Sequence, residues 1–411
     1  MKHVILLGDG MADYPVPELG GKTVVEAAYT PGMDRIAAEG TLGLIDTIPP
    51  GCTPGSDTAN LSILGYDPVK CNAGRGALEA ASMGVKLKPG DVAFRCNLVT
   101  LSDAGNLGNC VIEDFTAGHI GSDEAAVLIN HVGEKLGSKD LFFRPGVGYR
   151  HLMIWENGPD SLVTKPPHDI VGTAVAEYLP AGEGSDRLRE LIEHARELLP
   201  DHDVNRRRVS RGDKPANAIW PWGQGGLPPM EPLTSKYGMS GAMISAVDLL
   251  KGIGVCAGLE VLSVPGATGY TDTNYRGKAD EGLRWLERGD FLFLHVEAPD
   301  EMGHEGNIKG KIEAVEAFDR DVVSVMLDGL YSRKHEYRVL VLSDHATPVS
   351  VKTHVSDPSP FALLSSRSEE NRSRGVRFGE SDAVRSGILV SPGHTLMEHF
   401  MGDWRTFIEG F

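Results

Sequence analysis

Three short runs of the chain are apolar at nearly every position, and acidic and histidine residues gather where each run ends. The runs are "HVILLGDG" at residues 3–10, "DFLFLHVEAPD" at 290–300 and "YRVLVLSDHA" at 337–346. A strand that is apolar on both faces is typical of the middle of a sheet covered by helices on both sides. We therefore predict three buried strands whose carboxyl ends deliver acidic and imidazole groups.

The segment between the second and third runs has a helical pattern. Apolar residues recur there at helical spacing, namely at Ile312, Val315, Phe318, Val322 and Met326. A strand, a helix and a further strand form a crossover unit, which indicates parallel strands and the α/β fold class. In such sheets the functional site lies at the carboxyl ends of the strands.

The middle of the chain has a different pattern. The stretch "SDRLRELIEHARELLP" predicts a helix with Ser185 as its N-cap and Pro200 as its stop, and "FFRPGVGYRHLMIW" predicts two strands around a Pro-Gly turn. Because both outer parts contribute strands to one sheet, we predict an inserted domain at 72–232 and a core domain at 1–71 and 233–411. The polar segment 365–374, "SSRSEENRSR", predicts a mobile loop.

The stretch "PPGCTPGSDTANLSILGYDP" at residues 49–68 changes at Ser56 from turn-forming residues to an apolar, helical pattern. A serine at such a position is commonly an N-cap, whose side-chain oxygen accepts a free backbone N–H. It can instead be a nucleophile, because the N-terminus of a helix stabilises an alkoxide or a phosphate dianion. The local pattern by itself favours the cap.

Composition and charge narrow the class of protein. Of the 411 residues, 41% are apolar and 24% are charged, as in soluble globular proteins. The net charge of −17 argues against binding to nucleic acid or to an anionic membrane. The five cysteines form no C-x-x-C pair, and no apolar run approaches eighteen residues. These features predict a cytoplasmic protein and leave its oligomeric state open.

The polar residues near the three strand ends have the chemistry of metal ligands. They are Asp9, Asp300, His304, Asp344, His345 and, nine residues further on, His354. Carboxylates and imidazoles without thiolates suit manganese, zinc, cobalt or magnesium. Burying so many charges without a cation would be very costly. The sequence therefore predicts a metal centre at this edge of the sheet.

A family resemblance joins these observations. The motifs that carry it occur in one order along almost the whole chain: "GDGMAD", "PGSDTANLSILGYDP", "GRGALEAASMG", "AFRCNLVT", "ANAIWPWGQG", "VPGATGYTDT", "HVEAPDEMGHEG" and "SDHATPVSVKTH". The chain resembles the archaeal-type 2,3-bisphosphoglycerate-independent phosphoglycerate mutases of the alkaline phosphatase superfamily. The resemblance implies an alkaline-phosphatase-like core sheet with helices on both faces and an inserted lid domain.

The resemblance also implies a two-metal phosphoryl-transfer site, with Mn²⁺ as the expected ion and Zn²⁺, Co²⁺ or Mg²⁺ as alternatives. By motif position, one metal would be held by Asp300, His304 and His354. The other would be held by Asp9, Ser56, Asp344 and His345. Ser56 would then be the nucleophile, because metal coordination together with the helix terminus lowers the cost of its alkoxide.

A small phosphorylated acid also needs groups that bind its carboxylate, and guanidinium groups do so in a bidentate way. The candidates by context are Arg75, Arg95, Arg144, Arg150, His151, Arg208 and Lys236. The run 206–208 contains three arginines, and the sequence does not tell which faces inward. Asp114 and His119 are candidates for proton transfer. Members of the family often have arginine where this chain has His119.

The activity that the resemblance implies is the interconversion of 3-phosphoglycerate and 2-phosphoglycerate through a phosphoserine, with glycerate reorienting inside a closed cleft. A homoserine kinase-like phosphotransferase could use the same serine and metals. Hydrolysis of a phosphomonoester is a third alternative, against which the large insert argues, since a hydrolase need not hold the released alcohol. A binding module stabilised by metal is the alternative without catalysis.

Overall fold

The computed structural model describes residues 1–71, 74–159, 161–372 and 375–411, and within it the chain forms two compact units. The first, here called the core unit, comprises residues 1–72 and 230–411, and the second, called the insert, comprises residues 73–229. The sequence predicted that the insert begins at residue 72. Residues 72 and 73 lie outside the described residues.

The core unit is built on an eight-stranded sheet in the order β13-β2-β12-β11-β1-β10-β8-β9. Its strands are β1 Lys2–Gly8, β2 Thr41–Ile45, β8 Gly241–Ile244, β9 Glu260–Val261, β10 Phe291–Val296, β11 Tyr337–Leu342, β12 Ser359–Ser365 and β13 Leu389–Val390. The three predicted buried strands are confirmed as β1, β10 and β11, and β1 pairs in parallel with both of the others. One strand, β12, runs antiparallel to β11 and β2, which the sequence pattern did not predict.

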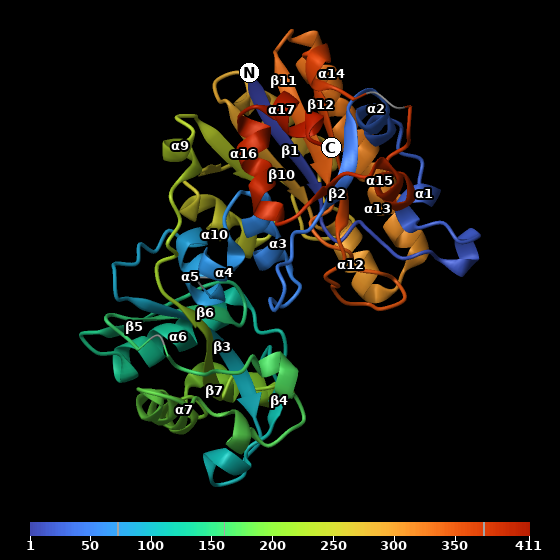
Figure 1. The fold of residues 1–411 in the computed structure, drawn as a ribbon. Helices are drawn as coiled ribbons and strands as arrows, with labels where there is room; N and C mark the ends of the chain where they lie inside the picture. The colour runs from blue at the N-terminus through green and yellow to red at the C-terminus, as the bar shows by residue number, and fades with distance from the viewer. Residues whose placement is uncertain (72–73, 160, 373–374) are drawn as a thin grey trace. The chain divides into compact units, whose positions relative to one another are not determined.

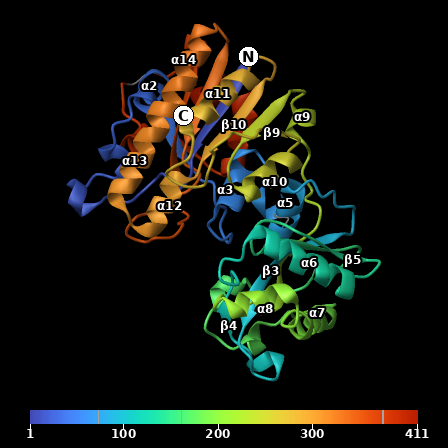
Figure 2. The same ribbon diagram turned by 180° about the vertical axis from the view of Figure 1, so that it is seen from behind.

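Helices cover both faces of this sheet (Figures 1 and 2). The helices of the core unit are α1 Val24–Ala27, α2 Pro31–Glu39, α3 Ser56–Ile63, α4 Pro68–Cys71, α9 Leu233–Lys236, α10 Asp248–Cys256, α11 Tyr275–Trp285, α12 Ala298–Glu305, α13 Ile308–Phe318, α14 Ser324–Ser332, α15 Glu380–Ser386, α16 Leu396–Met401 and α17 Trp404–Glu409. None of the helices in the described ranges is long and apolar enough to cross a membrane.

Alternate residues of the strands pack against different helices, because successive side chains of a strand point to opposite faces. Val4 and Leu6 of β1 belong to one core with α2, α11, α13 and α14. On the other face, His3 lies edge-on to Phe400 of α16, and Phe361 of β12 lies edge-on to Trp404 of α17. Figure 1 shows α16 and α17 in front of the sheet, and Figure 2 shows α11, α13 and α14 from behind. The predicted α/β class with helices on both faces is thus confirmed.

The predicted crossover helix between β10 and β11 is confirmed in position but is not continuous. A π-helical turn, Asp319–Val323, separates α13 from α14. Of the five apolar positions that predicted this helix, Ile312 is half-buried and the other four are buried. The wider turn places Asp319 under α2, where its carboxylate accepts hydrogen bonds from Gly32 N (2.9 Å) and Met33 N (2.6 Å).

The insert has an antiparallel sheet in the order β4-β3-β6-β5, with β7 also paired to β3. Its elements are α5 Arg75–Ser82, β3 Val92–Leu101, β4 Ile112–Asp114, α6 Ser122–Leu136, β5 Leu141–Arg144, β6 Arg150–Trp155, α7 Ser185–Leu198, α8 Asp203–Ser210 and β7 Ala218–Gly225. The predicted hairpin is confirmed by the antiparallel pairing of β5 with β6.

The predicted helix of the insert is confirmed as α7, but its predicted cap is wrong. Gly184 occupies the N-cap position with φ of 78°, and Ser185 is the first helical residue. This left-handed backbone favours glycine, which has no Cβ to clash, so the chain turns into the helix one residue earlier than the pattern indicated.

The predicted loop at 365–374 is wrong in part. Ser368–Glu370 form a 3₁₀ turn, and the Glu370 carboxylate is buried in a bidentate pair with Arg338, with both N–O distances at 2.8 Å. Residues 373 and 374 lie outside the described residues. A composition rich in charge cannot indicate that one of the charges has a buried partner on β11.

Candidate functional site

The site residues of the core unit meet because three parallel strands end at one edge of the sheet. Leu7 of β1 lies level with His295 of β10 and with Leu342 of β11. Asp9 follows β1 directly, and Asp344 follows β11 after one residue. The helix α12, which begins just after β10, carries Asp300 in its first turn. Asp9, Asp300 and Asp344 are far apart in the chain, and they therefore come together at this edge only through the fold.

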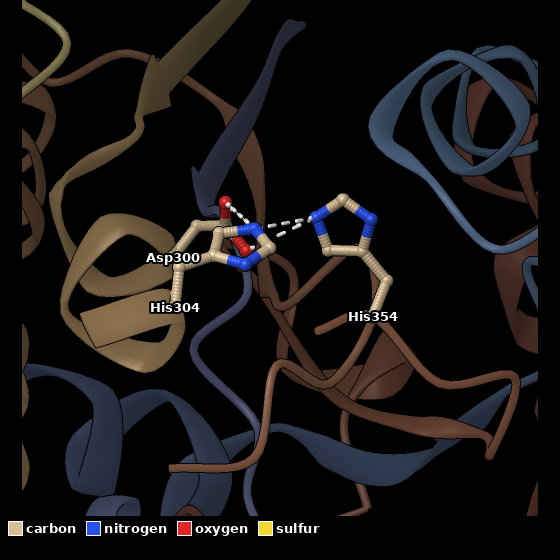
Figure 3. A group of neighbouring side chains, drawn as sticks. All are labelled: Asp300, His304 and His354. Atoms are coloured by element: carbon tan, nitrogen blue, oxygen red, sulfur yellow. Dashed lines mark hydrogen bonds and ion pairs between the residues drawn. The ribbon is translucent and has the colours of Figure 1, made fainter. Parts of the chain in front are cut away.

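One group of ligand-type side chains consists of Asp300, His304 and His354 (Figure 3). Asp300 and His304 are one turn apart on α12, and His304 Nε2 lies 3.2 Å from Asp300 Oδ2. His354 Nε2 lies 3.5 Å from Asp300 Oδ1 and only 3.0 Å from His304 Nε2. Two ring nitrogens that face each other at this distance require a proton or a cation between them, because both otherwise present lone pairs.

A second group consists of Asp9, Asp344 and His345, all fully buried. His345 Nε2 lies 3.4 Å from Asp9 Oδ1 and 3.5 Å from Asp344 Oδ2. Backbone and amide donors hold Asp344, since Gly10 N and Asn60 Nδ2 each donate to it at 3.0 Å. Burial lowers the pKa of His345, which favours the neutral imidazole that a metal ligand requires.

Ser56 joins this second group from the first turn of α3. Its Oγ lies 3.3 Å from His345 Nε2. The cap position of the helix is taken by Gly55, so the interpretation of Ser56 as a plain N-cap is wrong. Asn60, one turn further along α3, donates to the Ser56 carbonyl at 2.8 Å and to Asp344. The hydroxyl of Ser56 thus faces the buried acid–imidazole group at the N-terminus of a helix.

Gly10 brings the two groups together. Its φ of 55° lies in the left-handed region, and a Cβ at this position would collide with Asp300 and with the Thr347 hydroxyl. That hydroxyl in turn donates a hydrogen bond to Asp300. The glycine of the "GDG" motif therefore allows the turn after β1 to pass directly against the first group.

The side chains present fit divalent cations. Asp9 Oδ1 and Glu297 Oε2 are buried and have no hydrogen-bond partner among the described residues. Burial, and then the charges of Asp344, Glu297 and Asp300, raise the pKa of Asp9 well above its usual range. Several buried carboxylates in such proximity repel one another unless a cation is shared. Oxygen and imidazole donors without thiolates suit Mn²⁺, Zn²⁺, Co²⁺ or Mg²⁺.

Two residues of this region were not predicted from the sequence. His295 of β10 lies 2.7 Å from Asp9 Oδ2, and its Nε2 lies 3.4 Å from Glu297 Oε2. Asp9, His295 and Glu297 form a third group of ligand-type side chains. Burial raises the pKa of Glu297 to about 8. Both residues stand in the motif "HVEAPD", but His295 lies inside an apolar strand, where a single histidine gives no signal of its own.

In the insert, three of the predicted arginines lie near enough for the charges of Arg75 and Arg150 to act on Arg95. The Arg95 guanidinium lies 4.5 Å over the Trp222 ring and pairs with Glu79 at 3.0 Å. Burial lowers the pKa of Arg95; Glu79 opposes this, and the positive charges of Arg75 and Arg150 add to the lowering. The Nε of Arg95 is buried without a hydrogen-bond partner among the described residues. This arrangement, called here the arginine cluster (Arg75, Arg95 and Arg150), offers positive charge to an anion.

Three other predicted residues of the insert are held differently. Arg208 is the buried arginine of the run 206–208, and its guanidinium donates to Glu124 (2.8 Å), Ala117 O (2.7 Å) and Lys214 O (3.0 Å). His151 is buried, its Nδ1 accepts from Gly146 N at 3.0 Å, and burial lowers its pKa to about 4. Arg144 is exposed and lies 5.3 Å from the Phe142 ring on β5. Their proposed roles toward a substrate stay predictions.

The remaining predicted residues lie on the surface or in local turns. Lys236 is exposed at the end of α9, 5.2 Å from the Tyr237 ring. Asp114 accepts from the Thr116 hydroxyl at 2.6 Å and pairs with Lys214 at 3.1 Å. His119 is exposed with φ of 50°, and its N–H donates to Thr116. Proton transfer by Asp114 or His119 also stays a prediction.

An α/β sheet whose strand ends carry two adjacent carboxylate–imidazole groups beside a helix-terminal serine defines an α/β protein with a candidate two-metal centre. The family model for 2,3-bisphosphoglycerate-independent phosphoglycerate mutase matches residues 37–205. A protein of Methanosarcina barkeri with that name is 50% identical over 95% of this chain and 96% of its own length. The chain belongs to the 2,3-bisphosphoglycerate-independent phosphoglycerate mutase family, which is a family of enzymes.

Solved structures agree with this assignment. A Pyrococcus horikoshii protein superimposes with a TM-score of 0.81 at 31% identity, covering 98% of this chain and 97% of its own. A cofactor-independent phosphoglycerate mutase from Thermoplasma acidophilum superimposes with a TM-score of 0.68 at 25% identity, covering 98% of this chain and all of its own. The similarity therefore extends over the core unit and the insert.

Proposed function

We propose that the protein interconverts 3-phosphoglycerate and 2-phosphoglycerate through a phosphoserine at Ser56. The observation that carries the proposal is the position of Ser56 Oγ, at the first turn of α3 and 3.3 Å from His345 of the second group. A hydroxyl placed there is favoured as a nucleophile, because the helix terminus stabilises negative charge on it or on the phosphoryl group that it accepts.

Two divalent cations, held by Asp300, His304 and His354 and by Asp9, Ser56, Asp344 and His345, would stabilise the negative charge of the attacking and leaving oxygens. Mn²⁺ is the expected ion. The fit rests on Asp9 Oδ1, which is buried without a hydrogen-bond partner in the described part of the chain, and on the facing ring nitrogens of His304 and His354.

The chain's own residues would act in two transfers. In the first, the Ser56 hydroxyl gives up its proton and Oγ attacks phosphorus, while the bond from phosphorus to the C3 oxygen breaks and that oxygen takes up a proton. In the second, the C2 hydroxyl of glycerate gives up its proton and attacks phosphorus, and Ser56 Oγ leaves and regains a proton. The two transfers together leave the enzyme unchanged and move the phosphoryl group by one carbon.

Glycerate must remain bound between the two transfers, because water would otherwise hydrolyse the phosphoserine. A carboxylate is best retained by guanidinium groups. Within the insert, the arginine cluster supports this role, since Arg95 Nε is buried and has no hydrogen-bond partner among the residues that the structure describes, and Arg75 and Arg150 are exposed.

The test is ³¹P NMR of the purified protein with Mn²⁺ and 3-phosphoglycerate. We expect the 2-phosphoglycerate signal to appear and to be abolished in Ser56→Ala, with Ser62→Ala as a control on the same helix. Ser62 is buried, and its hydroxyl donates to Thr47 O at 2.6 Å, away from the acid–imidazole groups.

Two results would contradict the proposal. Full activity of Ser56→Ala would exclude a phosphoserine at Ser56 as the intermediate. Release of inorganic phosphate without 2-phosphoglycerate would indicate a phosphomonoesterase. A parallel sample with ATP and homoserine tests the kinase-like alternative, which would give phosphohomoserine and no turnover of 3-phosphoglycerate.

A further inference from the structure

His295 is a fully buried histidine with both ring nitrogens engaged. Its Nε2 lies 2.7 Å from Asp9 Oδ2, and its Nδ1 lies 3.1 Å from the Ser245 hydroxyl oxygen. Ser245 follows β8 directly, and β8 is the strand next to β10. The imidazole thus links Ser245, which follows β8, to the Asp9 carboxylate, which follows β1.

The direction of these hydrogen bonds follows from Ser245. The backbone N–H of Val247 donates to the Ser245 oxygen at 3.0 Å, so the hydroxyl hydrogen is free to point elsewhere. Among the described residues, its one hydrogen-bonding neighbour on that side is His295 Nδ1. Ser245 then donates to Nδ1, and the neutral ring carries its proton on Nε2. Nε2–H therefore donates to Asp9 Oδ2.

This hydrogen bond gives the two carboxylate oxygens of Asp9 different surroundings. Oδ2 accepts from His295, whereas Oδ1 is buried, makes no hydrogen bond within the described ranges and lies 3.4 Å from His345 Nε2. We propose that His295 is a positioning residue that acts through Asp9, holding Oδ1 toward the cation of the second group. The inference rests on the proposed function, because it assumes that Asp9 binds that cation.

The same three side chains could instead be ligands of a third cation, since Asp9, His295 and Glu297 lie close together. The distances favour the hydrogen bond. A separation of 2.7 Å between nitrogen and oxygen is that of a strong hydrogen bond, and a proton on Nε2 occupies the lone pair that a metal would need. Lys278 also lies here: it is buried and donates to His295 O at 3.1 Å, and the charge of Glu297 opposes the lowering of the Lys278 pKa by burial.

The experiment measures Mn²⁺ affinity and stoichiometry by isothermal titration calorimetry in four variants. His295→Leu removes the donor, His295→Gln keeps an N–H that can reach Asp9, Ser245→Ala removes only the orienting hydroxyl, and Asp344→Asn impairs the second group itself. Loss of a hydrogen-bond partner to a metal ligand typically costs about 10- to 100-fold in affinity. We expect that loss for one of two ions in His295→Leu, substantial recovery in His295→Gln, and a smaller loss in Ser245→Ala.

Nitrogen-15 NMR of the metal-free wild-type protein provides an independent readout. We expect the His295 ring to be neutral with its proton on Nε2. A proton on Nδ1 would overturn the inference, as would three Mn²⁺ ions per chain in the wild type falling to two in His295→Leu. Wild-type affinity in a folded His295→Leu would do the same.

Failure of the proposed function gives a different result. If Asp344→Asn binds two ions as tightly as the wild type, the second group holds no cation and the proposed metal centre is wrong. If Asp344→Asn loses an ion but His295→Leu and Ser245→Ala do not, the metal centre stands and only the role of His295 is wrong. Circular dichroism of each variant establishes that it is folded.

Discussion

Lys311 is a buried cation that joins the two loops from which the site residues come. Its Nζ donates to Asp13 Oδ2 (2.8 Å) and Ala12 O (3.1 Å) in the loop after β1, and to Thr347 O (2.9 Å) in the loop after β11. Lys311 and Asp13 are both fully enclosed at their side chains. All three ammonium hydrogens are used, so a single side chain fixes both loops.

We predict that Lys311→Met destabilises the protein by about 3–5 kcal/mol, because it leaves the Asp13 carboxylate buried without its partner. Urea unfolding followed by circular dichroism measures the loss. The matched control is Lys309→Met on the same helix, where an exposed pair with Glu313 should contribute less than about 1 kcal/mol. The double variant Asp13→Asn with Lys311→Met should recover part of the loss; if the single variant is as stable as the wild type, the bridge is unimportant.

The arginines of the insert differ in their surroundings, and this gives a second prediction at the residue scale. We expect Arg150→Ala to raise KM for 3-phosphoglycerate at least tenfold, since a charge-assisted hydrogen bond contributes about 1.5–3 kcal/mol. Arg144→Ala is the matched control, because both arginines are exposed and lie over a neighbouring aromatic ring, Phe142 for Arg144 and Tyr149 for Arg150. It is the charge of Arg150 that acts on Arg95. Steady-state kinetics with the Mn²⁺-loaded enzyme separates KM from kcat. An equal rise in KM for Arg150→Ala and Arg144→Ala would contradict a specific role of Arg150 in binding the substrate.

At the scale of elements, the π-helical turn between α13 and α14 supplies the cap of another helix. The N-cap residue of α2, Thr30, makes no capping hydrogen bond with its side chain, and its hydroxyl is buried without a partner among the described residues. Asp319 replaces that cap by accepting from the N–H groups of Gly32 and Met33. The π-helical turn between α13 and α14 thus supplies the acceptor for the first N–H groups of α2.

We predict that Asp319→Ala destabilises the protein by about 1–3 kcal/mol, because two buried N–H groups lose their acceptor. Burial raises the pKa of Asp319 to about 6, although the two N–H donors lower it. The folded state then binds the proton more tightly than the unfolded state, so this stabilisation is complete below about pH 4 and declines as the pH rises through 6.

The cost of Asp319→Ala should accordingly be larger at pH 4.5 than at pH 7.5, as measured by urea unfolding at each pH. Asp321→Ala in the same turn is the control, since Asp321 pairs with the exposed Arg320 beside it. A cost that rises with pH would contradict the raised pKa of Asp319.

At the scale of the whole molecule, the chain carries a net charge of −17, and four carboxylates of the core unit lie close together at the strand ends. We predict that a chelator lowers the melting temperature and that Mn²⁺ raises it, because a cation relieves the repulsion in the folded state only. Ligand at 100 times Kd stabilises by about 2.7 kcal/mol. Differential scanning calorimetry with EDTA or with Mn²⁺ measures the shift.

The insert provides the control for that experiment, because it has a hydrophobic core of its own. Leu128 of α6 is fully buried in it, and Leu128→Ala should cost about 2–5 kcal/mol. Since the ligand-type groups belong to the core unit, this variant should still bind Mn²⁺ as tightly as the wild type. An unchanged melting temperature of the wild type with chelator and with Mn²⁺ would argue against a cation in the folded protein.

Much of the local structure could be predicted from the sequence. Continuous apolar runs identified β1, β10 and β11, helical spacing identified α7 and the α13–α14 region, and a Pro-Gly turn identified the β5–β6 hairpin. Family membership and the α/β class were also predicted correctly. The misses have different causes: Gly184 replaces Ser185 as a cap by adopting positive φ, which is a local effect, whereas Glu370 is buried because it meets the distant Arg338 of β11.

What the sequence determined by itself is where strands and helices lie and which chemical groups stand at their ends, because these depend on neighbours within a few residues. Only the tertiary structure decided which of those groups meet. The contact of His295 with Asp9 and the bridge from Lys311 to Asp13 join residues nearly 300 positions apart. Likewise, Arg208 pairs with Glu124 and Arg95 with Glu79, and Arg95 Nε has no hydrogen-bond partner among the described residues. Such pairings depend on how distant segments pack, which no local pattern records.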